Sequence, residues 1–137
     1  MIYQLRQDLE NNFPTESIFA NMLGKIFPSE IVPDRCVLIQ EYGGGQPEPR
    51  TGFTNKGLQV ISRDIDPVKA RKLAYDFYDY LNDKFSITIN SVTIDGNIYP
   101  AVFILQISAN AEPQSIGYDE EGRAEFTTNY RIIYRRL

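Results

Sequence analysis

Apolar and polar positions over residues 57–94 follow a pattern that predicts a strand, a helix and a second strand. Residues 57–63 alternate with the two-residue period of a strand. Asp66 and Pro67 predict a helix start, because the carboxylate accepts from a free backbone N–H and proline lacks only a donor that has no partner there. The apolar residues that follow share one helical stripe, with Phe77 at its middle: Ala70, Leu73, Ala74, Phe77, Tyr78, Leu81 and Phe85.

The strand after this helix is predicted over residues 86–94, which are rich in Ile, Val and Thr. Its apolar phase changes at Asn90–Ser91, which predicts a bulge, and Asp95–Asn97 predict a turn. A helix with one apolar face between two strands packs on the sheet that those strands join. We therefore expect Phe77 to be buried against that sheet.

Further strands are predicted on both sides of this segment. Residues 35–42 carry apolar side chains on both faces, which indicates a strand covered on both sides. In residues 101–109, Phe103, Leu105 and Ile107 are expected on one face. Residues 124–135 alternate most regularly and predict an antiparallel strand with a charged outer face. The segments 43–56 and 110–122 are predicted as long loops.

The N-terminal segment is predicted to be helical. Ile2, Leu5, Leu9 and Phe13 have the spacing of one helix face, and Pro14 ends that helix. Thr15 or Ser17 could cap a second helix with an inner face of Ile18, Met22, Leu23 and Ile26. We expect these helices to cover the sheet, with docking on a neighbouring subunit as the alternative.

Together these elements predict one α+β domain over residues 1–137. Its sheet is expected to be mixed or antiparallel with about five strands, with one long helix packed across it and short N-terminal helices. Residues 1–34 form the helical N-terminal segment and residues 35–137 form the α+β core.

Composition narrows the function classes. The chain has no histidine, which removes Ser-His-Asp and Cys-His catalysis and His-based zinc sites and lowers the expectation of an enzyme. The net charge of −4 argues against a dedicated nucleic-acid binder. Cys36 is the single cysteine, so it cannot form an internal disulfide. Its place in an apolar strand predicts that it is a small buried hydrophobic residue. No signal peptide or apolar run of about 18 residues is present, so we expect a cytoplasmic protein without membrane contact.

Two loops carry candidate chemistry. The glycine-rich stretch that begins at Gly43 lacks the Gly-Lys-Ser/Thr ending of a phosphate-binding loop, but the loop 43–56 could close over a small molecule in a regulatory or ligand-binding domain. Asp119, Glu120 and Glu121 lack the spacing of a calcium loop. They suggest a solvated hairpin turn, with a carboxylate-dependent hydrolase as the other possibility. No metal and no cofactor is expected.

The charge order of the predicted helix is unusual. Cations lie near its N-terminus and anions near its C-terminus, whereas the macrodipole favours the reverse by about 0.3–1 kcal/mol per well-placed charge. The pattern indicates either a solvated face or a surface that serves a partner. The candidate interface residues on the helix and the glycine-rich loop are Lys69, Arg71, Lys72, Asp76, Asp79, Asp83, Gly43, Gly44, Gly45 and Arg50.

Several motifs in this order resemble one family. They are Glu41-Tyr42-Gly43-Gly44, Gly57-Leu58-Gln59-Val60-Ile61-Ser62-Arg63, the helix with Ala70, Ala74 and Leu81, Gly117-Tyr118-Asp119-Glu120-Glu121-Gly122-Arg123, and Thr128-Asn129-Tyr130-Arg131-Ile132. Between about residues 35 and 135 the chain resembles the minor capsid and tail-terminator, or tail-completion, proteins of long-tailed bacteriophages.

The resemblance implies a structural virion protein without catalysis or cofactor. Such a protein is made in the host cytoplasm and forms a ring, usually of six copies, on the tail tube at the head–tail junction. There it ends tube polymerisation and presents a joining surface to the head-completion, or stopper, protein. DNA would pass through the lumen only as cargo, and an acidic lining would avoid tight contacts with its phosphates.

Overall fold

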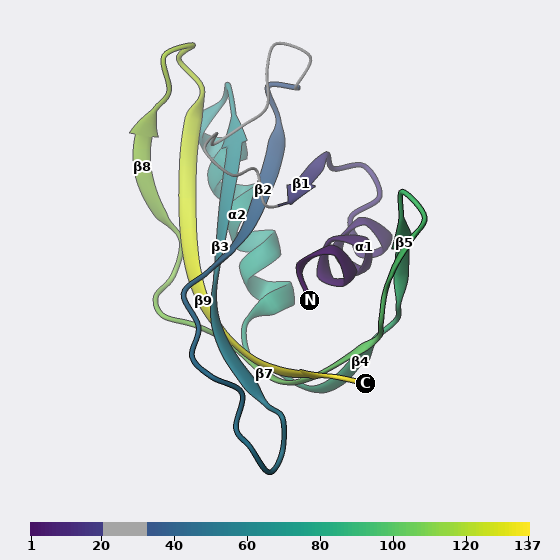
Figure 1. Ribbon diagram of the computed structural model, residues 1–137. Coiled ribbons are helices and arrows are strands. Elements are labelled where there is room, and N and C mark those ends of the chain that lie inside the picture. The colour runs from purple at the N-terminus through teal and green to yellow at the C-terminus, as the bar shows by residue number, and fades with distance from the viewer. Residues whose placement is uncertain (21–32) are drawn as a thin grey trace.

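The computed structural model describes residues 1–20 and 33–137 of the chain, which form an α+β fold (Figure 1). In chain order the elements are α1 (Ile2–Asn12), β1 (Ile18–Ala20), β2 (Cys36–Tyr42), β3 (Thr54–Asp64), α2 (Pro67–Leu81), β4 (Lys84–Ile89), β5 (Val92–Ile94), β6 (Asn97–Tyr99), β7 (Val102–Ala109), β8 (Gln114–Tyr118) and β9 (Ala124–Arg136). None of the helices in these ranges is long and apolar enough to cross a lipid bilayer.

The main sheet is organised around β9. The sheet has seven strands. Six of them follow the order β1-β2-β3-β9-β7-β4, and the seventh, β8, pairs with β9. All neighbours are antiparallel except β1 and β2. The thirteen residues of β9 are long enough to pair with β8 along their first part and with β7 along their last part. The expectation of about five strands was therefore too low, because β8 shares one edge of β9 with β7 and β1 joins the sheet beside β2.

The core lies on the face of this sheet that α1 and α2 cover (Figure 1). Leu5 and Leu9 of α1 and Phe77 of α2 join one apolar cluster with residues of β2, β3, β7 and β9. The Phe77 side chain is fully buried and stacks on Phe13, with ring centroids 4.3 Å apart. These contacts confirm the predicted burial of Phe77 and the predicted first helix.

Two predicted apolar positions of the helical segments lie elsewhere. The helix α2 ends at Leu81, so Phe85 lies in β4, where 57% of it is exposed. Ile18 forms the start of β1 instead of a second helix, because backbone pairing with Val37 and burial of Ile18 in the core outweigh a local helical pattern. The remaining positions of that predicted helix, Met22, Leu23 and Ile26, lie outside the described residues.

The faces of β7 also differ from the prediction. A register shift between Ile104 and Gln106 places Leu105 in a bulge. After the bulge the alternation changes phase, so Ile107 is buried with Ile104 and not exposed with Leu105. The expected common face of Phe103, Leu105 and Ile107 was wrong for this reason.

The predicted loops and turns are partly ordered as strands. Residues 54–56 belong to β3, and residues 114–118 form β8, so both loops are shorter than expected. The strand predicted over 86–94 divides at Asn90–Ser91 into β4, in the main sheet, and β5, in a separate hairpin with β6. That hairpin packs beside α1, where the Gln4 amide Nε2 donates to the Pro100 carbonyl at 2.7 Å.

Candidate functional site

The helix α2 begins as the sequence predicts. The Asp66 carboxylate accepts a hydrogen bond from the Val68 backbone N–H at 2.9 Å, and Pro67 occupies the first turn. Leu73, Phe77 and the other apolar residues of the stripe face the sheet. Because about 3.6 residues make one turn, the charged residues between them are left on the outer side.

The outer side of α2 forms a groove of about 570 Å³ with β9. We call this region the α2 surface; its residues are Pro67, Val68, Arg71, Lys72, Tyr75, Asp76, Asp79 and Phe126. Val68 is 75% exposed, which leaves it available for contact. Lys69 is exposed on the same helix, and Asp83 follows the helix with a φ of 59°.

Contacts within the α2 surface are few and local. The Lys72 Nζ donates to the Asp76 carboxylate at 2.8 Å, four residues along the helix. The Arg71 guanidinium lies 4.5 Å from the centroid of the Tyr75 ring. An ion pair four residues apart on an exposed helix, such as Lys72–Asp76, stabilises the helix by about 0.3–0.5 kcal/mol. The fold therefore gains little from these charges.

The predicted glycine residues line a different hollow. Gly43, Gly44 and Gly45 border a cavity of about 450 Å³ together with Lys56 and Arg131. Gly43 and Gly44 have φ values of 61° and 108°, in the left-handed region that other residues rarely adopt.

The loop beyond the glycines is an ordered turn. Glu48 accepts hydrogen bonds from the backbone N–H groups of Arg50 and Thr51 at 3.1 and 2.7 Å. Arg50 therefore lies at the tip of a structured extension of β2 and β3, which projects below the sheet in Figure 1.

The candidate residues thus fall into two groups in different parts of the fold. Tyr130 and Arg131 both line the glycine hollow although they are successive residues of β9 and point to opposite faces, so this hollow is not confined to one face of the sheet. The α2 surface lies on the helical side. The structure gathers Arg71, Lys72, Asp76 and Asp79 into one groove, and it does not bring the glycine-rich loop to them.

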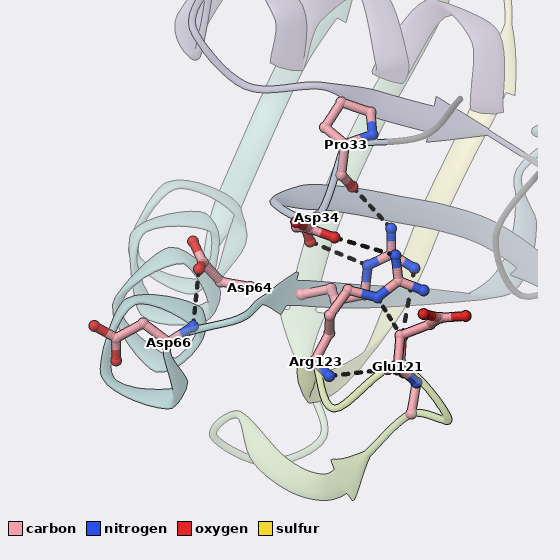
Figure 2. Close-up of polar contacts among 8 residues, drawn as sticks. Pro33, Asp34, Asp64, Asp66, Glu121 and Arg123 are labelled. Atoms are coloured by element: carbon pink, nitrogen blue, oxygen red, sulfur yellow. Dashed lines mark hydrogen bonds and ion pairs between the residues drawn. The ribbon is translucent and has the colours of Figure 1, made fainter. Parts of the chain in front are cut away.

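The structure also shows a polar cluster that the sequence did not single out as a site (Figure 2). Arg63 of β3 is central to it, with only 3% of its side chain exposed. Its guanidinium donates to the backbone carbonyls of Asp34 at 3.1 Å and Pro33 at 2.8 Å. Its Nη1 lies 3.7 Å from the Asp119 carboxylate in the β8–β9 turn. Arg63 therefore connects three segments that are far apart in the sequence.

Arg123 completes the polar cluster. Its Nε donates to the Asp119 carboxylate at 2.8 Å, and its Nη1 donates to Asp34 at 3.3 Å. Asp119 also accepts from the backbone N–H groups of Glu121 and Arg123, at 3.0 and 2.9 Å. Burial alone would raise the pKa of the Asp119 carboxyl, but these hydrogen bonds outweigh it and hold the pKa below its ordinary value. Asp119 thus stays ionised and closes the turn. An ionised carboxylate has no proton to donate, so Asp119 is unsuited to act as a general acid.

Glu125 lies beside Arg63 in the β3–β9 ladder and is only 8% exposed. Burial and the neighbouring charge of Asp119 raise the pKa of its carboxyl, while Arg63 and Arg123 oppose that rise.

Within the described residues, no group of three or more His, Cys, Asp or Glu side chains is placed to hold a metal ion. Cys36 is fully buried, as predicted, and burial raises the pKa of its thiol to about 11.

Sequence reasoning quoted Arg63, Asp119 and Arg123 within motifs but gave them no common role. The sequence offered one signal for the cluster: Arg63 is the single arginine of a half-apolar strand, and an acidic turn that ends in Arg123 follows much later in the chain. Since Asp34 and Arg123 are 89 positions apart, only the sheet register reveals that these segments meet.

Comparison with known proteins identifies the chain's relatives at the family level. The family model described as bacteriophage tail terminator protein matches residues 22–136, which is most of the chain. No curated protein matches the sequence. The matched segment contains the α2 surface, the glycine hollow and the polar cluster.

Proposed function

Because the chain belongs to the bacteriophage tail terminator family, we propose that it caps the phage tail tube as a ring, ends tube polymerisation and provides the surface that joins the tail to the head. The family match over residues 22–136 carries this proposal. Membership makes the chain a structural component of the phage tail; the hexameric ring and the contacts with the tail tube protein and the stopper protein are part of the proposal.

The α2 surface supports an assembly role. Its charges contribute little to the fold, and their order opposes the helix macrodipole. Surface charges of this kind set partner choice and orientation more than stability. We assign the α2 surface, with Lys69 and Asp83 beside it, to contacts with neighbouring subunits or with the tube.

The extension that carries Gly43, Gly44, Gly45 and Arg50 supports a second contact. It projects from the ends of β2 and β3, apart from the α2 surface, so a subunit could use both regions at once (Figure 1). Two different surfaces are what a head-to-tail ring requires, because each subunit presents one patch to one neighbour and another patch to the next. DNA would pass the lumen without sequence readout, which fits the net charge of −4.

The test reverses charge on the α2 surface. The double substitution Arg71→Glu and Lys72→Glu removes both cations from the groove but leaves the buried stripe unchanged. Its circular dichroism should match the wild type. When it replaces the wild-type protein during phage production, electron micrographs should show free heads and tails of irregular length.

A matched control makes the same charge change elsewhere. Arg6→Glu and Arg136→Glu reverse one cation on α1 and one at the end of β9, outside the α2 surface and outside the extension that carries Arg50. This control should still yield head-joined tails if the α2 contact is specific. Normal-length, head-joined tails from a folded Arg71→Glu, Lys72→Glu variant would overturn the interface, and infectious particles from a phage without the gene would overturn the tail-completion role.

A further inference from the structure

We propose that the α2 surface also pairs with the same surface of a second copy of this chain, with the two helices antiparallel. The pair is a two-fold dimer of the free protein and is distinct from the head-to-tail contacts of a ring. The inference rests on the charge order and groove geometry of α2, and it holds whether or not the proposed tail function is correct.

The charge pattern is self-complementary under a two-fold axis. Lys69, Arg71 and Lys72 lie before Tyr75, whereas Asp76 and Asp79 lie after it. If the axis passes close to Tyr75, Arg71 and Lys72 of one copy face Asp79 and Asp76 of the other, and the reverse pairing follows by symmetry. Helices in parallel orientation at the same register would instead place cation against cation. The order therefore selects an antiparallel pair.

The groove also supplies apolar contact at the centre of this pair. Tyr75 and Phe126 both line the groove. Val68, which is 75% exposed, lies about 10 Å along the helix from Tyr75 at 1.5 Å per residue. In the antiparallel arrangement Val68 of each copy reaches past the acidic end of the other helix. An aromatic centre with a charged rim is the usual anatomy of a protein interface.

The contacts that now occupy these charges are easily exchanged. The Lys72 side chain is 74% exposed although it pairs with Asp76 within the helix. The Arg71 guanidinium rests on the Tyr75 ring. Both cations can move to carboxylates of a second copy without uncovering the core. Because the same groove is assigned to tail contacts, pairing keeps it covered until the tail replaces the second copy.

Self-association of the wild type is the first measurement. Sedimentation should show a monomer–dimer equilibrium that shifts to monomer as salt rises from about 0.01 M to about 1 M, because the Debye length falls from about 30 Å to about 3 Å. Arg71→Glu with Lys72→Glu makes the whole surface anionic, and Asp76→Lys with Asp79→Lys makes it cationic. Each variant alone should associate at least about tenfold more weakly.

Mixing the two variants is the decisive experiment. In an antiparallel two-fold pair, an anionic surface faces a cationic one throughout, so the mixture should dimerise although neither variant does. A mixture that stays monomeric overturns the proposal, as does a wild type that is monomeric at every concentration and salt. Circular dichroism of each variant establishes that it is folded.

A cross-link tests the position of the axis. Tyr75→Cys places one thiol near the proposed axis, so a short bis-maleimide should join two copies through this residue. Cys36 does not compete, because it is fully buried. Asn11→Cys, on the exposed side of α1, is the control and should not cross-link. Equal cross-linking at both positions would overturn the assigned geometry. If the wild type does not dimerise but the Arg71→Glu, Lys72→Glu variant still prevents heads from joining tails, the proposed function stands and only the dimer is overturned. The two proposals can therefore fail separately.

Discussion

The apolar core under α2 and the polar cluster around Arg63 both hold distant segments together, but they do so by different physics. In the core, Phe77 packs against many apolar neighbours, and burial is non-directional. In the polar cluster, Arg63 depends on the positions of two carbonyls and one carboxylate. The core can tolerate small shifts of its neighbours, whereas the cluster fixes the register of Asp34, β3 and the β8–β9 turn.

The largest effect is expected in the core. Phe77→Ala removes a fully buried aromatic side chain that stacks on Phe13. It should lower the free energy of unfolding by about 3–5 kcal/mol, because the transfer of the ring and the cavity left behind both cost stability. Urea denaturation measures the change. A loss under about 1 kcal/mol would show that the ring is not packed as described.

A smaller effect is expected in the polar cluster. Arg63→Met keeps the aliphatic stem but leaves the carbonyls of Pro33 and Asp34 without their charged donor. It should cost about 1.5–3 kcal/mol, the range for hydrogen bonds to a charged group. Arg131→Met is the matched control, since Arg131 is exposed on the neighbouring β9, and it should change stability by less than about 0.5 kcal/mol. Equal losses in both variants would contradict the role of Arg63.

The smallest effect is a pH dependence inside the polar cluster. The pKa of the Glu125 carboxyl is raised in the folded protein, so its contribution to stability is present below the unfolded pKa and is lost as pH rises through the folded value. Asp119, whose pKa is lowered, contributes with the opposite sign and loses its contribution only as pH falls through the folded value. Relative to wild type, Glu125→Gln should therefore gain stability over the pH range that begins at the ordinary glutamate pKa of about 4 and extends upward. Thermal denaturation across this range measures it, and a flat difference would contradict the assignment.

The same contrast explains what the sequence could predict. The start of α2 at Asp66 and the burial of Phe77 depend on residues within a few positions of each other, and both predictions were confirmed. The strand β1 and the bulge at Leu105 depend on pairing with distant strands, so local patterns predicted a helix at Ile18 and an unbroken alternation through Leu105. In each case the error followed from a partner that lies far along the chain.

The candidate site divides in the same way. The α2 surface could be predicted because its charges are neighbours on one helix, and the structure gathers Arg71, Lys72, Asp76 and Asp79 in one groove. The sequence could not show that Gly43 to Gly45 lie in a hollow apart from the α2 surface, because that depends on how β2, β3 and β9 pair. Nor could it show that Asp34 meets Arg123, which is a consequence of the strand order.

The central place of β9 has a consequence for synthesis on the ribosome. The ribosome makes β9 after every other described strand, yet β9 separates β3 from β7 and provides the pairing edge for both. Until it emerges, the nascent chain holds two half-sheets whose inner edges have no partner, and such edges promote aggregation. A message truncated before codon 124 would release a product with both edges open, so proteases and chaperones are expected to remove it before it reaches an assembling tail.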